Sequence, residues 1–144
     1  MTQPPFEMER RAAAAQACVD RYADKPFAWG SADCGRLAAT TLKAMGHKVS
    51  LASFGGYSSE AGARRVLAKA GHADMASLLD TLPLMRIGHA RALPGDLIGF
   101  QGLDGWVAVA VVLGNGRVLG FVDGFARVLK PLVIETAWRV PCRR

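Results

Sequence analysis

The first half of the chain has the hydrophobic spacing of helices. Leu37, Thr41 and Met45 lie four positions apart and form one apolar face, which is typical of a helix that packs on a core. Ser31 or Asp33 stands just before this segment, where a short polar side chain can cap the first turn. The spacing predicts helices over Phe6–Ala23, Cys34–Met45, Glu60–Ala70 and Asp74–Leu82.

The second half has the pattern of an antiparallel sheet. Trp106–Leu113 is apolar nearly throughout, which predicts a strand buried on both faces. Gly114-Asn115-Gly116 after it is a strong hairpin signal. The predicted strands are Asp96–Gln101, Trp106–Leu113, Arg117–Val122, Phe125–Leu129 and Glu135–Val140. Pro83–Leu93 is expected to be a connector. Helices followed by an antiparallel sheet define the α+β class.

The chain is expected to be one domain, 1–144, with flexible ends at 1–5 and 141–144. Its 144 residues are 51% hydrophobic and 21% charged, which excludes disorder as the main state. The longest apolar run, Val107–Leu113, is far shorter than the roughly 20 residues of a membrane span. The N-terminus has no apolar segment of the kind found in secretory signals.

Charge and cysteine usage narrow the classes of function. The net charge is +6, from 18 basic and 12 acidic residues, but the basic residues are dispersed, so nucleic-acid binding is not expected. Three widely spaced cysteines, Cys18, Cys34 and Cys142, do not form a disulfide framework, and we expect reduced thiols in a chain made in a cytosol. The histidines and cysteines show no metal-ligand spacing, so neither a metal nor another cofactor is expected.

The stretch around Cys34 is the most informative for chemistry. A cysteine in the first turn of a helix lies near the positive end of the helix dipole, which favours the thiolate and suits a nucleophile. Trp29 and Gly30 would shape the rim of its pocket, and Asp33 would either cap the helix or orient the loop. The alternative is that Cys34 is simply a small buried residue, as most free cysteines are.

The residues around Cys34 also resemble a motif of a known protein family. Phe27-Ala28-Trp29-Gly30 followed by Asp33-Cys34 resembles the nucleophile motif of NlpC-type cell-wall cysteine peptidases. Leu93–Phe100 is similar to the Pro-Gly-Asp-Leu strand of that family, and Val109–Gly116 to its next strand and hairpin. The resemblance implies a papain-like domain in which N-terminal helices pack on a C-terminal antiparallel sheet.

A closer resemblance covers nearly the whole chain. Its motifs are Pro26–Gly30, Asp33-Cys34, Tyr57-Ser58, Gly62-Ala63, Gly95-Asp96-Leu97 and Ala137–Val140. They resemble a small family related to these peptidases and encoded in the tail modules of tailed phages, prophages and gene-transfer agents. The resemblance implies a location in the virion tail after synthesis in the cytoplasm of a bacterial host.

The departures from the peptidase pattern concern catalysis. The histidine of the active peptidases aligns with Ala108, and no histidine follows His89. Loss of a general acid–base costs about 10²–10⁴-fold in rate. His47 would lie about 20 Å from Cys34 along the same helix. His89 is the candidate surrogate base, although it also reads as an exposed loop histidine. Asp96, in a Pro-Gly-Asp turn, is either functional or turn chemistry.

These observations favour a structural component of a siphovirus-like tail tip or baseplate, with other tail proteins as partners and no catalysis expected. The alternative is an active cysteine hydrolase that cuts peptidoglycan stem peptides during DNA entry, with Cys34 as nucleophile and His89, or a histidine from a partner chain, as base. A weaker alternative is an assembly chaperone that leaves the finished tail.

Overall fold

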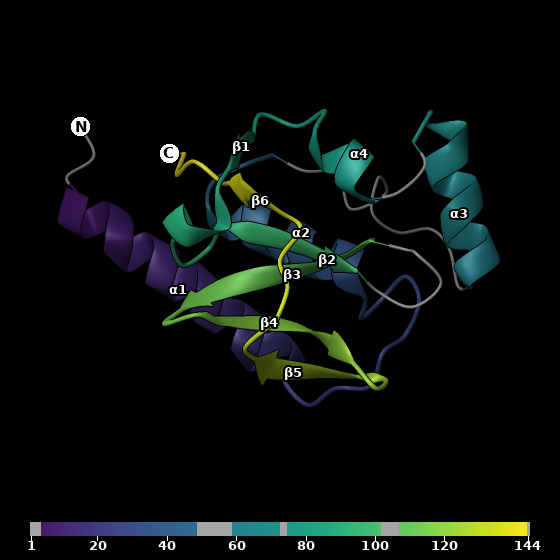
Figure 1. The fold of residues 1–144 in the computed structure, drawn as a ribbon, viewed down its shortest axis with the longest axis horizontal. Helices are drawn as coiled ribbons and strands as arrows, with labels where there is room; N and C mark the ends of the chain where they lie inside the picture. The colour runs from purple at the N-terminus through teal and green to yellow at the C-terminus, as the bar shows by residue number, and fades with distance from the viewer. Residues whose placement is uncertain (1–3, 49–58, 73–74, 102–106, 144) are drawn as a thin grey trace.

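The computed structural model of the protein describes residues 4–48, 59–72, 75–101 and 107–143. Helices form the first part of the chain and strands the second (Figure 1). The helices are α1 (Pro4–Tyr22), α2 (Cys34–Ala44), α3 (Glu60–Lys69) and α4 (Met75–Leu79), and a single 3₁₀ turn is η2 (His89–Arg91). The strands are β1 (Met85–Ile87), β2 (Leu97–Gln101), β3 (Val107–Gly114), β4 (Arg117–Val122), β5 (Phe125–Leu129) and β6 (Thr136–Arg139).

The predicted helices and the five predicted strands are confirmed, and the fold is α+β. The expectation of a plain connector over Pro83–Leu93 is wrong, because β1 and η2 lie within it. Met85 and Arg86 are both exposed, so β1 carries no alternating pattern that could have predicted it. It exists because its backbone pairs with β6. Trp106 and Tyr57-Ser58 lie outside the described residues.

All strand pairs are antiparallel, in the order β1-β6-β2-β3-β4-β5. The hairpin predicted at Gly114–Gly116 joins β3 to β4, and Asn115 has the left-handed φ of 55° that such a turn requires. The connection from β5 to β6 crosses one face of the sheet and places β6 between β1 and β2 (Figure 1).

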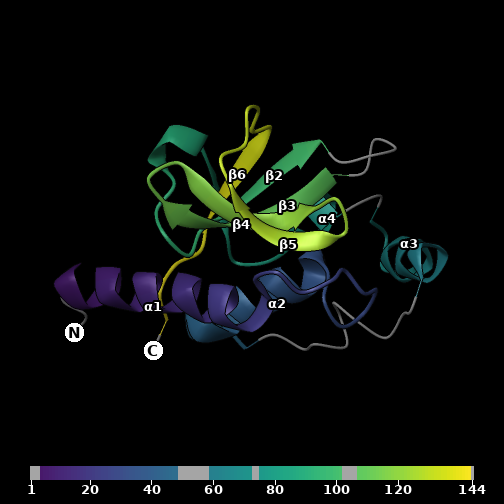
Figure 2. The same cartoon turned by 90° about the horizontal axis from the view of Figure 1, so that it is seen from below.

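Helices α1 and α2 cover the other face of the sheet (Figure 2). Ala14, Cys18 and Tyr22 lie four residues apart along α1 and form its buried stripe. The predicted face of α2 is buried too. Both helices pack against the side chains of β2, β3, β4 and β6 that point toward them, and together these form the main core.

Strand β3 is buried on both faces, as its apolar run predicts. Val109 and Val111 belong to the main core under the helices. Ala110 and Val112 belong to a second, smaller apolar cluster on the opposite face. Ile134, in the connection that crosses the sheet, packs against this second cluster. The alternation fixes which side chains of β3 face α2 and which face away.

The C-terminal segment returns to the helix layer beside α1 (Figure 2). The sequence predicts a flexible end over 141–144, whereas the structure holds its first part against α2. The backbone N–H of Arg143 donates to the carbonyl oxygen of Met45 at 2.7 Å. The last turn of α2 is therefore covered by the end of the chain.

Candidate functional site

Cys34 is the first residue of α2 and lies against β3. Its thiol is partly buried and packs on the main core, and it forms a hydrogen bond with the backbone of Val109. The structure thus brings the N-terminal end of α2 together with the strand that follows the Pro-Gly-Asp segment. All three cysteines of the chain are free thiols.

The surroundings of Cys34 stabilise the thiol rather than the thiolate. Burial, together with a smaller contribution from charge repulsion by the neighbouring Asp33 carboxylate, raises the pKa of Cys34 to about 11. Hydrogen bonds with the backbone of Val109, Gly35 and Cys34 itself act in the opposite direction without offsetting burial. The pKa of Cys34 is therefore shifted in the direction opposite to the one expected from the helix start, because burial disfavours the charged thiolate.

Asp33 performs both of the roles considered for it. One carboxylate oxygen, Oδ1, accepts the backbone N–H of Arg36 at 2.9 Å and caps α2. The other, Oδ2, accepts the N–H of Gly30 at 2.8 Å and holds the preceding loop. Gly30 has a φ of 82°, which suits glycine. The ring of Trp29 packs edge-on against Phe27, with centroids 4.7 Å apart. This motif is a rigid loop-and-cap unit.

His89 lies apart from Cys34. It is exposed in η2, and the apolar residues that flank this turn, Ile87 and Ala92, pack against the second cluster on the face of the sheet away from α2. Figure 2 shows the turn on the side of the sheet opposite α1 and α2. The interpretation of His89 as a surrogate base is therefore wrong for this chain by itself, because the sheet separates it from the thiol.

Ala108 also points away from the thiol. It pairs with Phe100 across the β2–β3 ladder and lies two residues from Ala110, which packs in the second cluster. The side chain of β3 that faces α2 at this level is Val109, which is 1% exposed. Asp33 is the single ionisable side chain that influences the Cys34 thiol within the described part of the chain.

Asp96 is the centre of a buried polar network. Its Oδ1 accepts from Arg11 at 3.0 Å and from the backbone N–H of Val140 at 2.9 Å. Its Oδ2 accepts from Arg139 at 2.8 Å and from the N–H of Leu93 at 2.9 Å. The carboxylate thus closes the turn before β2 and also ties that turn to α1 and to the end of β6.

Sequence reasoning missed the partner of Asp96. Arg11 is 2% exposed, and its Nη2 donates to the carbonyl oxygen of Val140 at 2.6 Å. The signal was present in the spacing, because Arg11 precedes Ala14 and Cys18 on the buried stripe of α1 at helical intervals. A charged residue on an apolar stripe indicates a buried ion pair.

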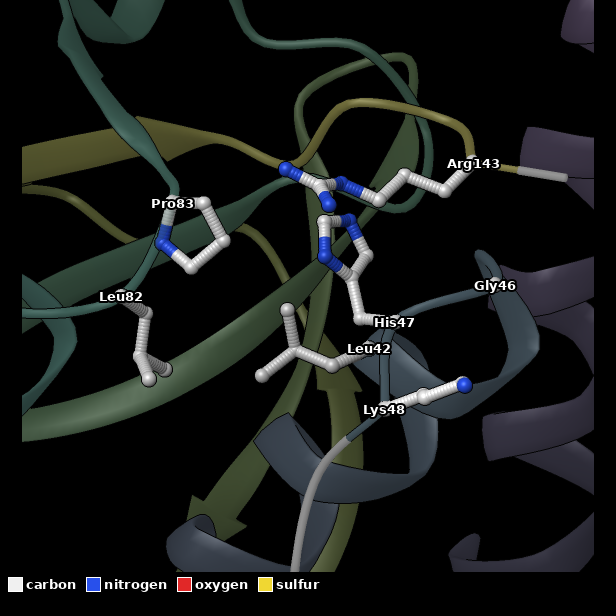
Figure 3. Close-up of a pocket in the computed structure, with 7 residues that line it drawn as sticks. All are labelled: Leu42, Gly46, His47, Lys48, Leu82, Pro83 and Arg143. Atoms are coloured by element: carbon white, nitrogen blue, oxygen red, sulfur yellow. The ribbon is translucent and has the colours of Figure 1, made fainter.

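A pocket that the sequence did not predict opens at the other end of α2 (Figure 3). Its volume is about 410 Å³. It is lined by Leu42, Gly46, His47, Lys48, Leu82, Pro83 and Arg143. The segment Gly46-His47-Lys48 after the helix was the available signal, but Arg143 reaches the pocket only through the tertiary fold.

Among the described residues no group of His, Cys, Asp and Glu is arranged to hold a metal ion, and no helix is long and apolar enough to span a membrane. No curated protein and no solved structure matches the chain. One protein family does match, over residues 8–140, so the chain belongs to the family described as a domain of unknown function, DUF6950.

Proposed function

We propose that this protein is a structural component of a siphovirus-like phage tail tip or baseplate, built on a papain-like, NlpC-type scaffold that no longer carries out catalysis. The tail location rests on the ordered motifs from Pro26–Gly30 to Ala137–Val140. The scaffold is supported by a cysteine-headed helix that packs against the strand after Gly95-Asp96-Leu97. The partners would be other tail proteins, after synthesis in the cytoplasm of the bacterial host.

The observation that carries the loss of catalysis is the surface that faces the Cys34 thiol. That surface is apolar and includes Val109, which is buried in the main core. A cysteine hydrolase needs a group that takes the thiol proton and later protonates the leaving amine. Here the adjacent ionisable group is Asp33, whose two oxygens are already engaged by backbone N–H groups.

The test is a phage that carries Cys34→Ala, with Cys142→Ala as the matched control. We expect the chain in purified particles at a fixed copy number and normal infection by both variants. Normal assembly with a clear infection defect limited to Cys34→Ala would contradict the proposal. That result would favour the hydrolase of peptidoglycan stem peptides, with a histidine from a partner chain. Absence of the chain from purified particles would instead indicate an assembly chaperone.

A further inference from the structure

We infer that the pocket at the C-terminal end of α2 binds a carboxylate that carries an apolar group, and that His47 and Arg143 hold the carboxylate. This inference does not rest on the proposed function. The pocket lies at the opposite end of α2 from Cys34, and none of its lining residues contributes to the cap around the thiol. Its volume, about 410 Å³, lies in the range of small-molecule sites.

His47 presents an unpartnered ring nitrogen to the pocket. The side chain is 7% exposed, and Nε2 donates to the carbonyl oxygen of Pro141 at 2.6 Å when it carries the proton. Figure 3 shows the other nitrogen, Nδ1, on the side of the ring that faces Leu82 and Pro83 across the pocket. Nδ1 has no hydrogen-bond partner among the described residues. Because Nε2 donates to Pro141, Nδ1 can donate to a carboxylate only when both ring nitrogens carry a proton, so His47 would bind the ligand as an imidazolium.

Arg143 is placed over the pocket by its backbone. Gly46 has a φ of 90°, and a Cβ at that position would lie 2.1 Å from the carbonyl oxygen of Arg143. Glycine therefore allows the C-terminal segment to lie directly on the end of α2. Figure 3 shows the Arg143 side chain extending across the pocket from the C-terminal segment. No ion pair engages this guanidinium within the described residues.

The two sides of the pocket define the ligand. No acidic side chain lines it in the described part of the chain, and Lys48 adds positive charge at the rim while pointing away from the cavity (Figure 3). The side of the pocket that carries Arg143 and Lys48 attracts an anion. The facing wall is made by Leu42, Leu82 and Pro83 and favours an apolar group. A planar carboxylate matches a guanidinium through paired hydrogen bonds, whereas inorganic phosphate would leave the apolar wall bare.

The chemistry required is that of an acylated apolar amino acid, or equally of a protein chain that ends in an apolar residue. N-acetyl-leucine is the first probe, and N-acetyl-leucinamide is its uncharged match. A six-residue peptide that ends in leucine with a free carboxylate represents the second source. Binding is followed on the full chain by NMR shifts of the His47 ring and of the pocket amides.

We expect N-acetyl-leucine to shift these signals with saturation, and the amide and inorganic phosphate to bind at least tenfold more weakly. Arg143→Gln keeps the backbone contact with Met45 and should weaken binding about tenfold. His47→Gln should weaken it roughly three- to tenfold. Arg117→Gln removes the same charge at the exposed start of β4 and should leave the affinity unchanged.

Equal binding of the acid and the amide would overturn the inference, as would equal effects of Arg143→Gln and Arg117→Gln or the absence of any shift. Phosphate that binds as well as N-acetyl-leucine would overturn the role assigned to the apolar wall. The peptide distinguishes the two sources of the ligand. Tighter binding of the peptide than of N-acetyl-leucine indicates a partner chain end, and equal binding indicates a small acid.

Discussion

The two ends of α2 differ in a way that reverses their apparent importance in the sequence. The N-terminal end carries the motif Asp33-Cys34, yet partial burial raises the pKa of its thiol. The C-terminal end carries no motif, yet it gathers His47 and Arg143 around an open pocket. One helix thus has a closed end and an open end.

The difference shows that residue identity does not fix reactivity. At Cys34 burial disfavours the charged thiolate and raises the pKa of the thiol. At the other end the guanidinium of Arg143 keeps contact with an open cavity, so its charge remains available to a ligand. A motif therefore indicates chemistry only when its surroundings are known.

The largest expected effect comes from Asp96→Asn, which tests what holds the open end in place. The variant leaves the guanidinium of Arg11 buried beside a neutral group, and the free energy of unfolding should fall by about 3–5 kcal/mol. Urea unfolding measures it. Asp24→Asn is the matched control, because Asp24 is exposed and pairs with exposed Arg127, so the loss there should stay below about 1 kcal/mol. Equal losses in the two variants would show that the buried network is not needed.

Gly46→Ala tests the contact between the C-terminal end of α2 and the C-terminal segment. The new Cβ would meet the Arg143 carbonyl oxygen and force the C-terminal segment away from α2. We expect a loss of about 2–4 kcal/mol, from the left-handed backbone and the displaced tail together. Gly71→Ala has a similar φ of 87° with nothing within 4 Å, so it should lose only about 1 kcal/mol. If the two variants lose the same amount, the contact with the tail contributes nothing.

The closed end can be tested by alkylation with iodoacetamide, read at each cysteine by mass spectrometry. The pKa of an ordinary cysteine thiol is 9.0, whereas the pKa of Cys34 is about 11. The Cys34 thiolate therefore forms only as the pH rises toward 11. Between pH 7 and 9 we expect Cys34 in the folded chain to react roughly 100-fold more slowly than in urea-unfolded chain. Its rate should keep increasing beyond pH 9. Rapid reaction below pH 7, faster than at Cys142, would mean an activated nucleophile.

The smallest expected effect is that of Ala108→His, which restores the peptidase residue at the aligned position. The side chain at this position faces the second cluster and not α2, so the alkylation rate of Cys34 should stay within about twofold of the parent. The unchanged rate is informative only in a folded variant, which circular dichroism establishes. A clear acceleration at neutral pH would place residue 108 beside the thiol after all.

Local features of the fold were predictable from the sequence. The apolar run of β3, the turn at Gly114–Gly116 and the polar residue before Cys34 each act within a few residues, and each specified its element. The short strand β1 was not predictable, because partner β6 supplies its stability from about fifty residues away.

The candidate site was harder to predict, for a physical reason. The pKa of Cys34 depends on how deeply the sulfur is buried, and no spacing rule reports that depth. The pocket depends on Arg143 meeting Gly46 and His47, which only the complete fold brings together. The buried role of Arg11 could have been inferred from its place on the stripe of α1, although its acceptors could not.

The network around Asp96 also determines the order in which parts of the chain can fold during synthesis. Arg11 is separated from Asp96 by 85 residues and from Val140 by 129. A ribosome that adds about 5–20 residues per second therefore exposes Arg11 for several seconds before its acceptors exist. Until then the guanidinium is better solvated in water than buried, so α1 cannot dock permanently on a partial chain. The final docking of α1 therefore has to wait for the synthesis of Val140, 129 residues after Arg11, which couples closure of the core to a distant part of the chain.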